Sequence, residues 1–271
     1  MGDAPAAISR QNVGMTNDHP TLATLEAEAA RLGVTLDAEA LERFGRYLAL
    51  IIAWSRRAGL TSVSDPDEIQ RRHLAESLAL QVLLRDAGIA TGAATDDSTG
   101  DSGTMIVDIG AGAGFPGVPM LIADPSLRLT LVESNGRRCD FLREVVRDLS
   151  LDGVSVVNAR AEDAGRDPEL RAQFDLVVAR AVAPMPVLVE YALPLLRKGG
   201  LLATPKGSRA IDDLAQAEAA IAALGGVAEP SLPLSLPANV PPQTVLLVRR
   251  TGKLKERYPR RAGIPAKRPI E

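Results

Sequence analysis

Hydrophobic positions in the first third of the chain recur at the period of a helix. From Thr21 onward, apolar side chains return at spacings of three and four residues, which is typical of amphipathic helices packed on one face. The clearest run is Leu41, Phe44, Leu48, Ile51 and Ile52. Asp65 followed by a proline has the pattern of a helix start and predicts a helix to about Leu84. Residues 21–90 are therefore predicted to form a helical N-terminal subdomain.

Short β-branched runs alternate with helical patterns in the rest of the chain. The predicted strands are 105–109, 128–133, 154–158, 174–179, 200–205 and 243–250, and the plainest helices are 137–149 and 184–196. Such alternation implies right-handed crossovers and a parallel sheet covered on both faces. The last strand follows a Pro-rich stretch without a convincing crossover helix, so we predict it to be antiparallel. The fold class is α/β, with a doubly wound, Rossmann-like, mostly parallel sheet in residues 105–250.

Three other segments carry no such periodicity. Residues 1–20 are predicted to be a disordered leader, and residues 91–104, rich in Gly, Ser, Thr and Asp, a flexible insertion. Residues 251–271 form a basic C-terminal tail. Between Arg249 and Arg268 there are nine Lys or Arg residues against a single acid, Glu256. Such a tail can neutralise phosphates, although it can also be a solvated end without a partner.

Composition narrows the class of protein. Of the 271 residues, 46% are hydrophobic and 24% are charged, which is ordinary for a globular protein with a sizeable core. The single cysteine, Cys139, cannot form an internal disulfide, and the first twenty residues lack a signal peptide pattern. No apolar run approaches the roughly 18 residues that cross a bilayer. We therefore expect a cytoplasmic protein without membrane association. The net charge of -3 argues against nucleic-acid binding over the whole surface.

A glycine-rich loop follows the first predicted strand, in the stretch IVDIGAGAGFPGVP. Gly110, Gly112 and Gly114 alternate directly after the strand, so the backbone can approach a ligand with no Cβ in the way. In an open α/β sheet, ligands bind outside the carboxyl ends of the strands, where the strand order reverses. This loop is therefore the predicted cofactor site.

The loop is compatible with two cofactors. Gly112, Gly114 and Gly117 form a G-x-G-x-x-G motif, which suggests a dinucleotide and an NAD-dependent oxidoreductase. Counted from the strand end, however, the motif starts at Asp108, and two prolines follow where a dinucleotide requires a regular helix N-terminus. An acid near the loop suits a cation, and S-adenosylmethionine carries both a sulfonium and an α-amino group. We therefore favour S-adenosylmethionine.

Residues at the ends of the next strands complete the predicted site. Glu133 ends the second strand, roughly twenty residues beyond the loop, where a carboxylate accepts hydrogen bonds from ribose hydroxyls. Taken singly, it is equally well explained as an acid at a helix N-terminus. Ala161 and Glu162 follow the third strand and are predicted to line an adenine pocket, while Arg180 follows the fourth and faces the same crevice. His73 is interpreted as a partly buried structural histidine, and no metal ligands are assigned.

Several segments match the motifs of a known family in the same order. They are Gly59-Leu60-Thr61-Ser62-Val63, Arg72-His73 with Glu76-Ser77, the loop 107–119 with its two prolines, Glu133-Ser134, Arg180-Ala181, Pro205-Lys206-Gly207, and the tail 257–265. From about Leu41 to Arg268 the chain resembles the bacterial small-subunit ribosomal RNA methyltransferase family, also called the glucose-inhibited division protein B family. The insertion at 91–104 and the long leader depart from the family pattern.

The resemblance implies a specific reaction. It implies a Rossmann-like methyltransferase fold, S-adenosylmethionine as cofactor, and N7 of one guanine in 16S ribosomal RNA of the small subunit as acceptor. It also implies contacts to the methyl donor from Gly110, Phe115, Ala161, Glu162 and Arg180. Guanine N7 carries a lone pair and no proton, so catalysis needs positioning and no general base. We expect Arg180 and Lys206 to orient the acceptor in a monomeric enzyme. A non-enzymatic alternative is an RNA-binding assembly factor with a vestigial pocket.

Overall fold

The computed structural model describes residues 20–61, 63–89, 103–237 and 239–271. The leader predicted over residues 1–20 and the insertion predicted over residues 91–104 lie almost wholly outside these ranges. Within the described residues, no helix is both long and apolar enough to cross a membrane.

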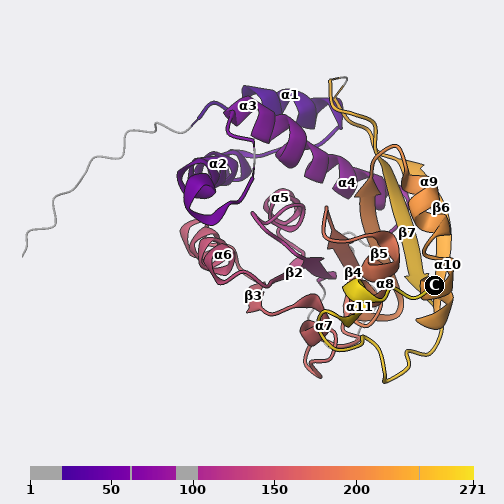
Figure 1. Cartoon of the computed structure of the whole chain (residues 1–271). Coiled ribbons are helices and arrows are strands. Elements are labelled where there is room, and N and C mark those ends of the chain that lie inside the picture. Colours follow the sequence, from indigo (N-terminus) through magenta and orange to yellow (C-terminus); the bar gives the residue numbers. More distant parts are fainter. Residues whose placement is uncertain (1–19, 62, 90–102, 238) are drawn as a thin grey trace, which may run out of the picture.

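A seven-stranded sheet forms the centre of the molecule, with strand order β3-β2-β1-β4-β5-β7-β6 (Figure 1). The strands are β1 Met105–Ile109, β2 Arg128–Glu133, β3 Val154–Asn158, β4 Phe174–Ala179, β5 Leu196–Lys206, β6 Gly226–Pro233 and β7 Thr244–Arg250. β1 to β5 pair in parallel, whereas β7 is antiparallel to both β5 and β6. The predicted late antiparallel strand is confirmed. β2 and β3 lie on one side of β1, whereas β4 and β5 lie on the other. This reversal of strand order opens a crevice at the carboxyl ends of β1 and β4.

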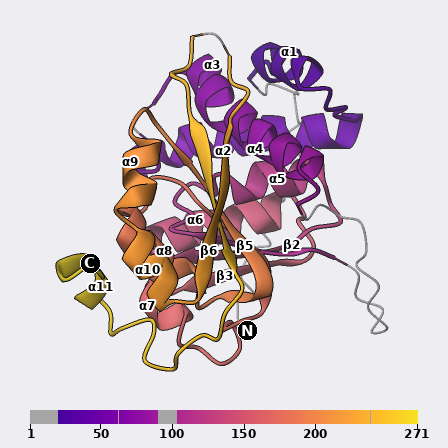
Figure 2. The ribbon, with the colours of Figure 1, turned by 90° about the vertical axis from the view of Figure 1, so that its right-hand side faces the viewer.

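Helices cover both faces of this sheet (Figures 1 and 2). They are α1 Ala23–Arg31, α2 Ala38–Ala58, α3 Pro66–Ile69, α4 Ala75–Asp86, α5 Gly117–Ala123, α6 Gly136–Asp148, α7 Ala161–Ala164, α8 Met185–Ala192, α9 Ala210–Ala215, α10 Glu218–Ala223 and α11 Ile264–Lys267. Val177 and Leu202 pack in a core with α8 and α10, whereas their neighbours Leu176 and Leu201 pack in a second core with α2, α4, α5 and α6. Because successive side chains of a strand point to opposite faces, the doubly wound arrangement is confirmed.

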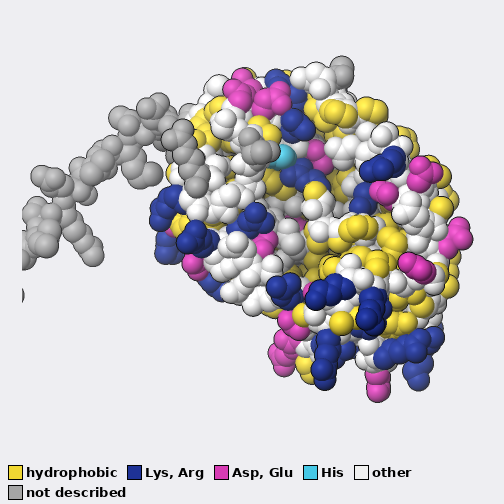
Figure 3. All heavy atoms as spheres, viewed as in Figure 1, with side chains coloured by type: hydrophobic (Ala, Val, Ile, Leu, Met, Phe, Trp, Pro, Cys, Tyr) yellow, Lys and Arg dark blue, Asp and Glu magenta, His cyan; other side chains and the backbone are white. Residues whose placement is uncertain are grey.

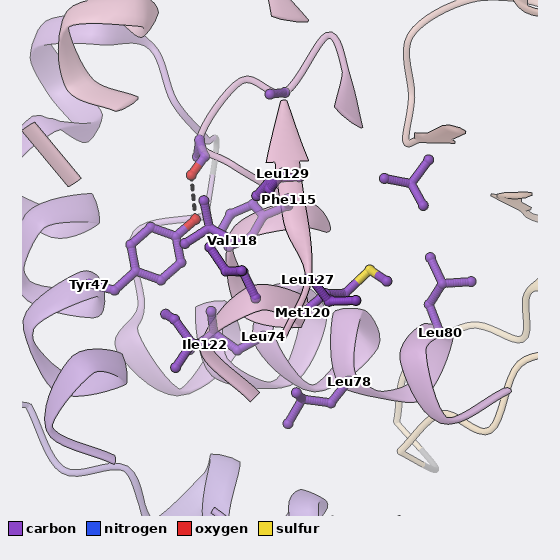
Figure 4. Close-up of a cluster of buried hydrophobic side chains, with 14 of the residues drawn as sticks. Tyr47, Leu74, Leu78, Leu80, Phe115, Val118, Met120, Ile122, Leu127 and Leu129 are labelled. Carbon is purple, nitrogen blue, oxygen red and sulfur yellow. Dashed lines mark hydrogen bonds between the residues drawn. The ribbon is translucent and has the colours of Figure 1, made fainter. Parts of the chain in front are cut away.

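The N-terminal helices pack directly on the elements around the glycine-rich loop. α2 contacts α5 and α6, and α4 contacts α5. Tyr47 of α2 is fully buried, its hydroxyl donates to the carbonyl of Ala113, and its ring centroid lies 5.8 Å from that of Phe115. Figure 4 shows Tyr47 in this position beside Phe115 and Val118. The helical subdomain therefore helps to shape the loop.

Three elements before the last strand were not predicted. α9 and α10 are six residues each, which is too short to display a clear helical period, and β6 contains Pro230 and Pro233. Proline lacks the N–H that a central strand must donate, but β6 is the edge of the sheet and tolerates it. α9 and α10 lead from β5 into β6, whereas no helix is described between β6 and β7, as expected for the Pro-rich stretch. The helix predicted over 184–196 ends at Ala192, ahead of Pro194.

Candidate active site at the carboxyl edge of the sheet

The three alternating glycines of the loop adopt left-handed backbone conformations. Their φ angles are +65° at Gly110, +58° at Gly112 and +92° at Gly114. A Cβ at Gly110 would lie 2.9 Å from a methyl group of Val182, and a Cβ at Gly114 would lie 2.7 Å from a methyl group of Val118. At Gly112 the nearest atom would be 3.7 Å away. Gly110 and Gly114 are therefore required by packing, whereas Gly112 leaves space for a ligand to approach the backbone.

Glu133 joins β2 to this loop. Its Oε2 accepts from Gly112 N at 3.0 Å and its Oε1 from Asn135 N at 2.8 Å, and the residue is 4% exposed. The N-terminus of α6 is capped by the Asn135 side chain, which accepts from the amides of Arg137 and Arg138. The first-turn amides of α6 are thus capped by Asn135, while Glu133 accepts from the amide of Asn135 itself. A carboxylate oxygen can accept more than one hydrogen bond, so Glu133 retains capacity for hydroxyl groups of a ligand.

Asp108 lies beneath the loop as a fully buried carboxyl group. Its Oδ2 accepts from Gly117 N at 2.9 Å, while no partner within the described residues reaches its Oδ1. Burial raises the pKa of Asp108 well above its ordinary value. An unpartnered buried carboxyl oxygen fits a ligand that supplies a cation or a hydrogen-bond donor, as S-adenosylmethionine does with its α-amino group.

The start of α5 does not fit a pyrophosphate. Gly117 N donates to Asp108, Val118 N donates to the carbonyl of Gly114, and Pro119 has no N–H. A dinucleotide-binding helix offers the amides of its first turn to phosphate oxygens. Here the first-turn amides are already used or missing, so the G-x-G-x-x-G interpretation fails on geometry.

Ala161 and Glu162 begin α7, in the turn after β3. Ala161 is partly buried and packs with the core around α8. Glu162 is 3% exposed, and its Oε1 accepts from Gly263 N of the C-terminal segment at 2.7 Å. Burial, followed by the charge of Glu162, raises the pKa of the adjacent Tyr191 to about 12. The carboxylate of Glu162 is therefore held in place by residues that are distant in sequence.

Arg180, at the end of β4, points toward the N-terminal helices. Its Nη2 lies 2.9 Å from His73 Nδ1, and its Nη1 donates to the carbonyl of Arg72 at 3.2 Å. Nη1 also lies 3.4 Å from Oε1 of Glu76, which is 5% exposed. The guanidinium carbon lies 5.2 Å from the ring centroid of Phe115. Arg180 thus compensates a buried carboxylate and links the sheet to the N-terminal subdomain.

His73, in the π-helical segment Gln70–Leu74, contacts both Arg180 and Phe115. Its ring stacks on Phe115 with centroids 4.8 Å apart. Nδ1 lies 2.9 Å from Arg180 Nη2, which can only donate, and 2.9 Å from the carbonyl oxygen of Arg72, which can only accept, while Nε2 lies 3.1 Å from Thr61 Oγ1. Both ring nitrogens therefore have polar partners in either tautomer. π-Helical turns are frequent at functional sites. His73, Phe115 and Arg180 therefore form one cluster in which each side chain contacts the other two.

This cluster predicts an acid-sensitive stability. Burial, and after it the charge of Arg180, lowers the pKa of His73 from 6.5 to about 4. The unfolded state then binds more protons between these two values, so the free energy of unfolding falls as pH drops through this window, by up to about 1.4 kcal/mol per pH unit. In urea titrations between about pH 7 and pH 4, the free energy of unfolding should fall more steeply with decreasing pH for the wild type than for His73→Gln. Equal slopes would contradict the assignment.

Lys206 lies at the carboxyl edge of the sheet, but in a different part of it from Arg180. It ends β5, is half-buried, and its Nζ donates to the carbonyl of Ala183 at 3.2 Å. Burial lowers the pKa of Lys206. Lys206 borders an open hollow of about 840 Å³, whose other lining residues include Val182, Arg209 and Asp213. Val182 is also the side chain that approaches Gly110, so the hollow adjoins the glycine-rich loop. Arg180 and Lys206 therefore face different surroundings.

The geometry can be compared with known proteins. The rRNA small subunit methyltransferase G family matches residues 40–234, a range that contains the loop, Glu133, Glu162, Arg180 and Lys206. The chain belongs to the rRNA small subunit methyltransferase G family. The resemblance drawn from the motifs is therefore confirmed.

Relatives in this family match nearly the whole chain. Ribosomal RNA small subunit methyltransferase G of Roseiflexus castenholzii is 44% identical over 242 residues, which is 89% of this chain and 97% of that protein. The protein of the same name from Desulfitobacterium hafniense is 38% identical over 240 residues, 89% of this chain and 93% of that protein. Among solved structures, Precorrin-6y C5,15-methyltransferase from Geobacter metallireducens is similar with a TM-score of 0.45 and 17% identity, over 65% of this chain and 88% of that one.

Some residues of this methyltransferase-family site were missed by sequence reasoning. Tyr47 was not distinguished from other positions of an amphipathic helix, and Glu76 was named only as part of a family motif, without a role, although both contact the site. His73 was interpreted as a structural histidine, and the structure adds its stack on Phe115 and its bond to Arg180. The family motif in residues 72–77, which includes His73 and Glu76, was the available signal. Within the described residues, no group of His, Cys, Asp or Glu side chains is arranged to hold a metal ion.

Proposed function

We propose that this protein transfers a methyl group from S-adenosylmethionine to N7 of a guanine in 16S ribosomal RNA of the small subunit. It acts as a cytoplasmic monomer. The proposal is carried by the loop itself, which combines a buried unpartnered carboxyl oxygen, an open backbone at Gly112 and a helix start without free amides. These features suit a cationic nucleoside and leave the first turn of α5 without amides for a pyrophosphate. Family membership supports the reaction class.

The methyl donor supplies an electrophilic methyl group on a sulfonium, and the residues of this chain position it. Gly112 and Glu133 form the side of the site that receives ribose hydroxyls, and Asp108 lies below the loop as the partner for a cation. Ala161 and Glu162 form the adenine side. Gly114 and Phe115 act through the shape of the loop, because both are buried, whereas the exposed Gly110 leaves its backbone open to the donor.

The acceptor guanine is placed in the hollow beside Lys206. Guanine N7 attacks with an in-plane lone pair, so no proton has to be removed and no base is required. Holding nucleophile and methyl group at near-attack distance can contribute about 7 to 11 kcal/mol. Lys206 donates toward guanine O6 or a phosphate, while its bond to the carbonyl of Ala183 keeps the ammonium from moving freely. Arg180 orients the site indirectly, by holding Phe115 and the N-terminal helices.

Ribosomal RNA is bound through a band of cations near the C-terminus. Figure 3 shows Lys and Arg side chains gathered on the lower part of one face, where Figure 1 draws α7, α11 and the C-terminal segment. The exposed cations of that segment are Lys253, Lys255, Arg257, Arg261, Lys267 and Arg268. Neutralising phosphates releases counterions, so RNA affinity should fall with salt concentration.

Labelled methyl transfer tests the reaction. Purified protein is incubated with labelled S-adenosylmethionine and undermethylated small ribosomal subunits, and the modified base is identified by mass spectrometry. A single N7-methylguanine is the expected product. RNA binding without transfer would instead support an assembly factor with a vestigial pocket, and binding of NADH would support the oxidoreductase alternative.

Lys206→Met should lower the single-turnover rate by about 10- to 100-fold, because a charge-assisted hydrogen bond contributes about 1.5–3 kcal/mol. Affinity for S-adenosylmethionine should stay unchanged, since Lys206 lines the hollow rather than the loop. Arg209→Ala is the matched control, as Arg209 is an exposed cation of the same hollow. Rapid-quench kinetics with saturating RNA and methyl donor would measure the rates. A wild-type rate in Lys206→Met would remove the role.

A further inference from the structure

The chain beyond β7 returns to the body of the protein as an ordered strap. We define the C-terminal strap as residues 255–265. Arg171 Nη1 donates to the carbonyl of Tyr258 at 2.8 Å, and Arg166 Nε donates to the carbonyl of Pro259 at 2.7 Å. The Tyr258 side chain is 6% exposed and packs into the core around α8. The strap is thus fixed along α7 and α8 by its backbone as well as by its side chains.

A buried ion pair fastens the middle of the strap. Glu190 of α8 is fully buried, and Arg260 satisfies its carboxylate with the backbone N at 2.8 Å, Nε at 2.9 Å and Nη2 at 2.6 Å. Hydrogen bonding to Glu190 raises the pKa of Arg260. A charge without solvent contact is tolerated only when it is paired and hydrogen-bonded, so Glu190 requires Arg260. The position of the strap is set by this pair.

The strap reaches the cofactor site three residues further on. Gly263 adopts a φ of +80°, and its N–H donates to Glu162 Oε1 at 2.7 Å. Glu162 is 3% exposed and begins α7 directly after β3, at the edge where Glu133 also lies. α8 contributes to both contacts, because Glu190 holds Arg260 while the neighbouring Tyr191 lies against Glu162. α8 therefore contacts both the strap, through Glu190, and the site residue Glu162 of α7, through Tyr191.

We propose that the C-terminal strap is a working part of the methyl-donor site and that Arg260 is its positioning residue. The pair of Arg260 with Glu190 keeps the Gly263 amide on one carboxylate oxygen of Glu162, and so presents the other oxygen to the adenine side of the donor. This inference rests on the proposed function, in which Glu162 contacts the donor. Without the strap, the Glu162 carboxylate is hydrated and mobile, and ordering it on binding weakens affinity by about tenfold.

The strap is tested by calorimetric titration of S-adenosylmethionine into the full-length protein and its variants. Arg260→Ala should weaken binding by about tenfold, and Arg260→Lys by less, since lysine keeps the charge but loses the planar fork. Ala262→Ser is the control, because Ala262 is an exposed residue of the same strap and belongs neither to the donor site nor to the band of cations, and it should bind the donor like the wild type. In steady-state assays, Arg260→Ala should raise the KM for the donor and leave kcat nearly unchanged.

A second variant covers the case in which Arg260→Ala fails to fold with an unpaired Glu190. Glu190→Gln combined with Arg260→Ala removes the buried charge together with its partner, and hydrogen exchange at Gly263 reports whether the strap is released. Faster exchange with weakened donor binding supports the proposal. Faster exchange with wild-type donor affinity overturns it while leaving the proposed function intact. A wild-type protein that binds no S-adenosylmethionine overturns the proposed function, and the strap proposal with it.

Discussion

A Gly112→Ala variant is expected to bind S-adenosylmethionine at least about tenfold more weakly than the wild type while remaining folded. Gly112 has a φ of +58°, and an alanine Cβ there would meet no protein atom closer than 3.7 Å. Left-handed backbone costs an L-residue about 1–2 kcal/mol, which the core can tolerate. The added methyl group, however, occupies the space in which a ligand approaches the backbone. A loss of about 1.4 kcal/mol of binding free energy corresponds to about tenfold weaker affinity.

Gly33→Ala separates backbone strain from the loss of ligand space. Gly33, in the turn after α1, has a φ of +69°, and an alanine Cβ there would have no atom within 4 Å. Both variants should lose similar free energy of unfolding in urea titrations. Only Gly112→Ala should lose affinity in calorimetric titrations with the methyl donor. Wild-type affinity in both variants would show that Gly112 does not face the donor.

Arg180→Ala should lower the free energy of unfolding by about 3 kcal/mol or more, because it removes one partner of a buried ion pair. Glu76, only 5% exposed, would keep its carboxylate without the guanidinium that lies 3.4 Å away. Phe115 and His73 would lose their contacts with Arg180 at the same time. Urea denaturation followed by far-UV circular dichroism measures the loss. The structure thus predicts that most of the damage to activity arises through the loop and the N-terminal helices.

A double variant distinguishes this role from direct contact with substrate. Glu76→Gln removes the buried charge, so Arg180→Ala should cost less in a Glu76→Gln background than in the wild type. A coupling energy of about 0.5–3 kcal/mol between neighbouring sites is expected from such a cycle. If Arg180→Ala leaves stability unchanged but abolishes methyl transfer, Arg180 contacts the methyl donor or the acceptor directly, as the family motif suggested.

The central strands could be predicted because their signal is local. β1, β2, β3 and β4 were predicted with the bounds that the structure shows, since each is a short β-branched run bounded by turn residues. α9, α10 and β6 escaped prediction, because two helical turns carry too little periodicity and a proline in a strand is tolerated only at an edge. Whether a strand is central or at the edge depends on its neighbours, which the local pattern does not contain.

By itself, the sequence determined the fold class, the glycine-rich loop and the family, since all of these are expressed in short contiguous patterns. Only the tertiary structure decided which charged residues are already paired. Arg260 is taken by Glu190, seventy positions earlier, and Arg180 by His73 and Glu76, more than one hundred positions earlier, whereas Lys206 borders the open hollow. In the sequence, Arg260 and its exposed neighbour Arg261 look equivalent. Their roles differ because burial makes an unpaired charge costly, and burial is a property of the folded chain.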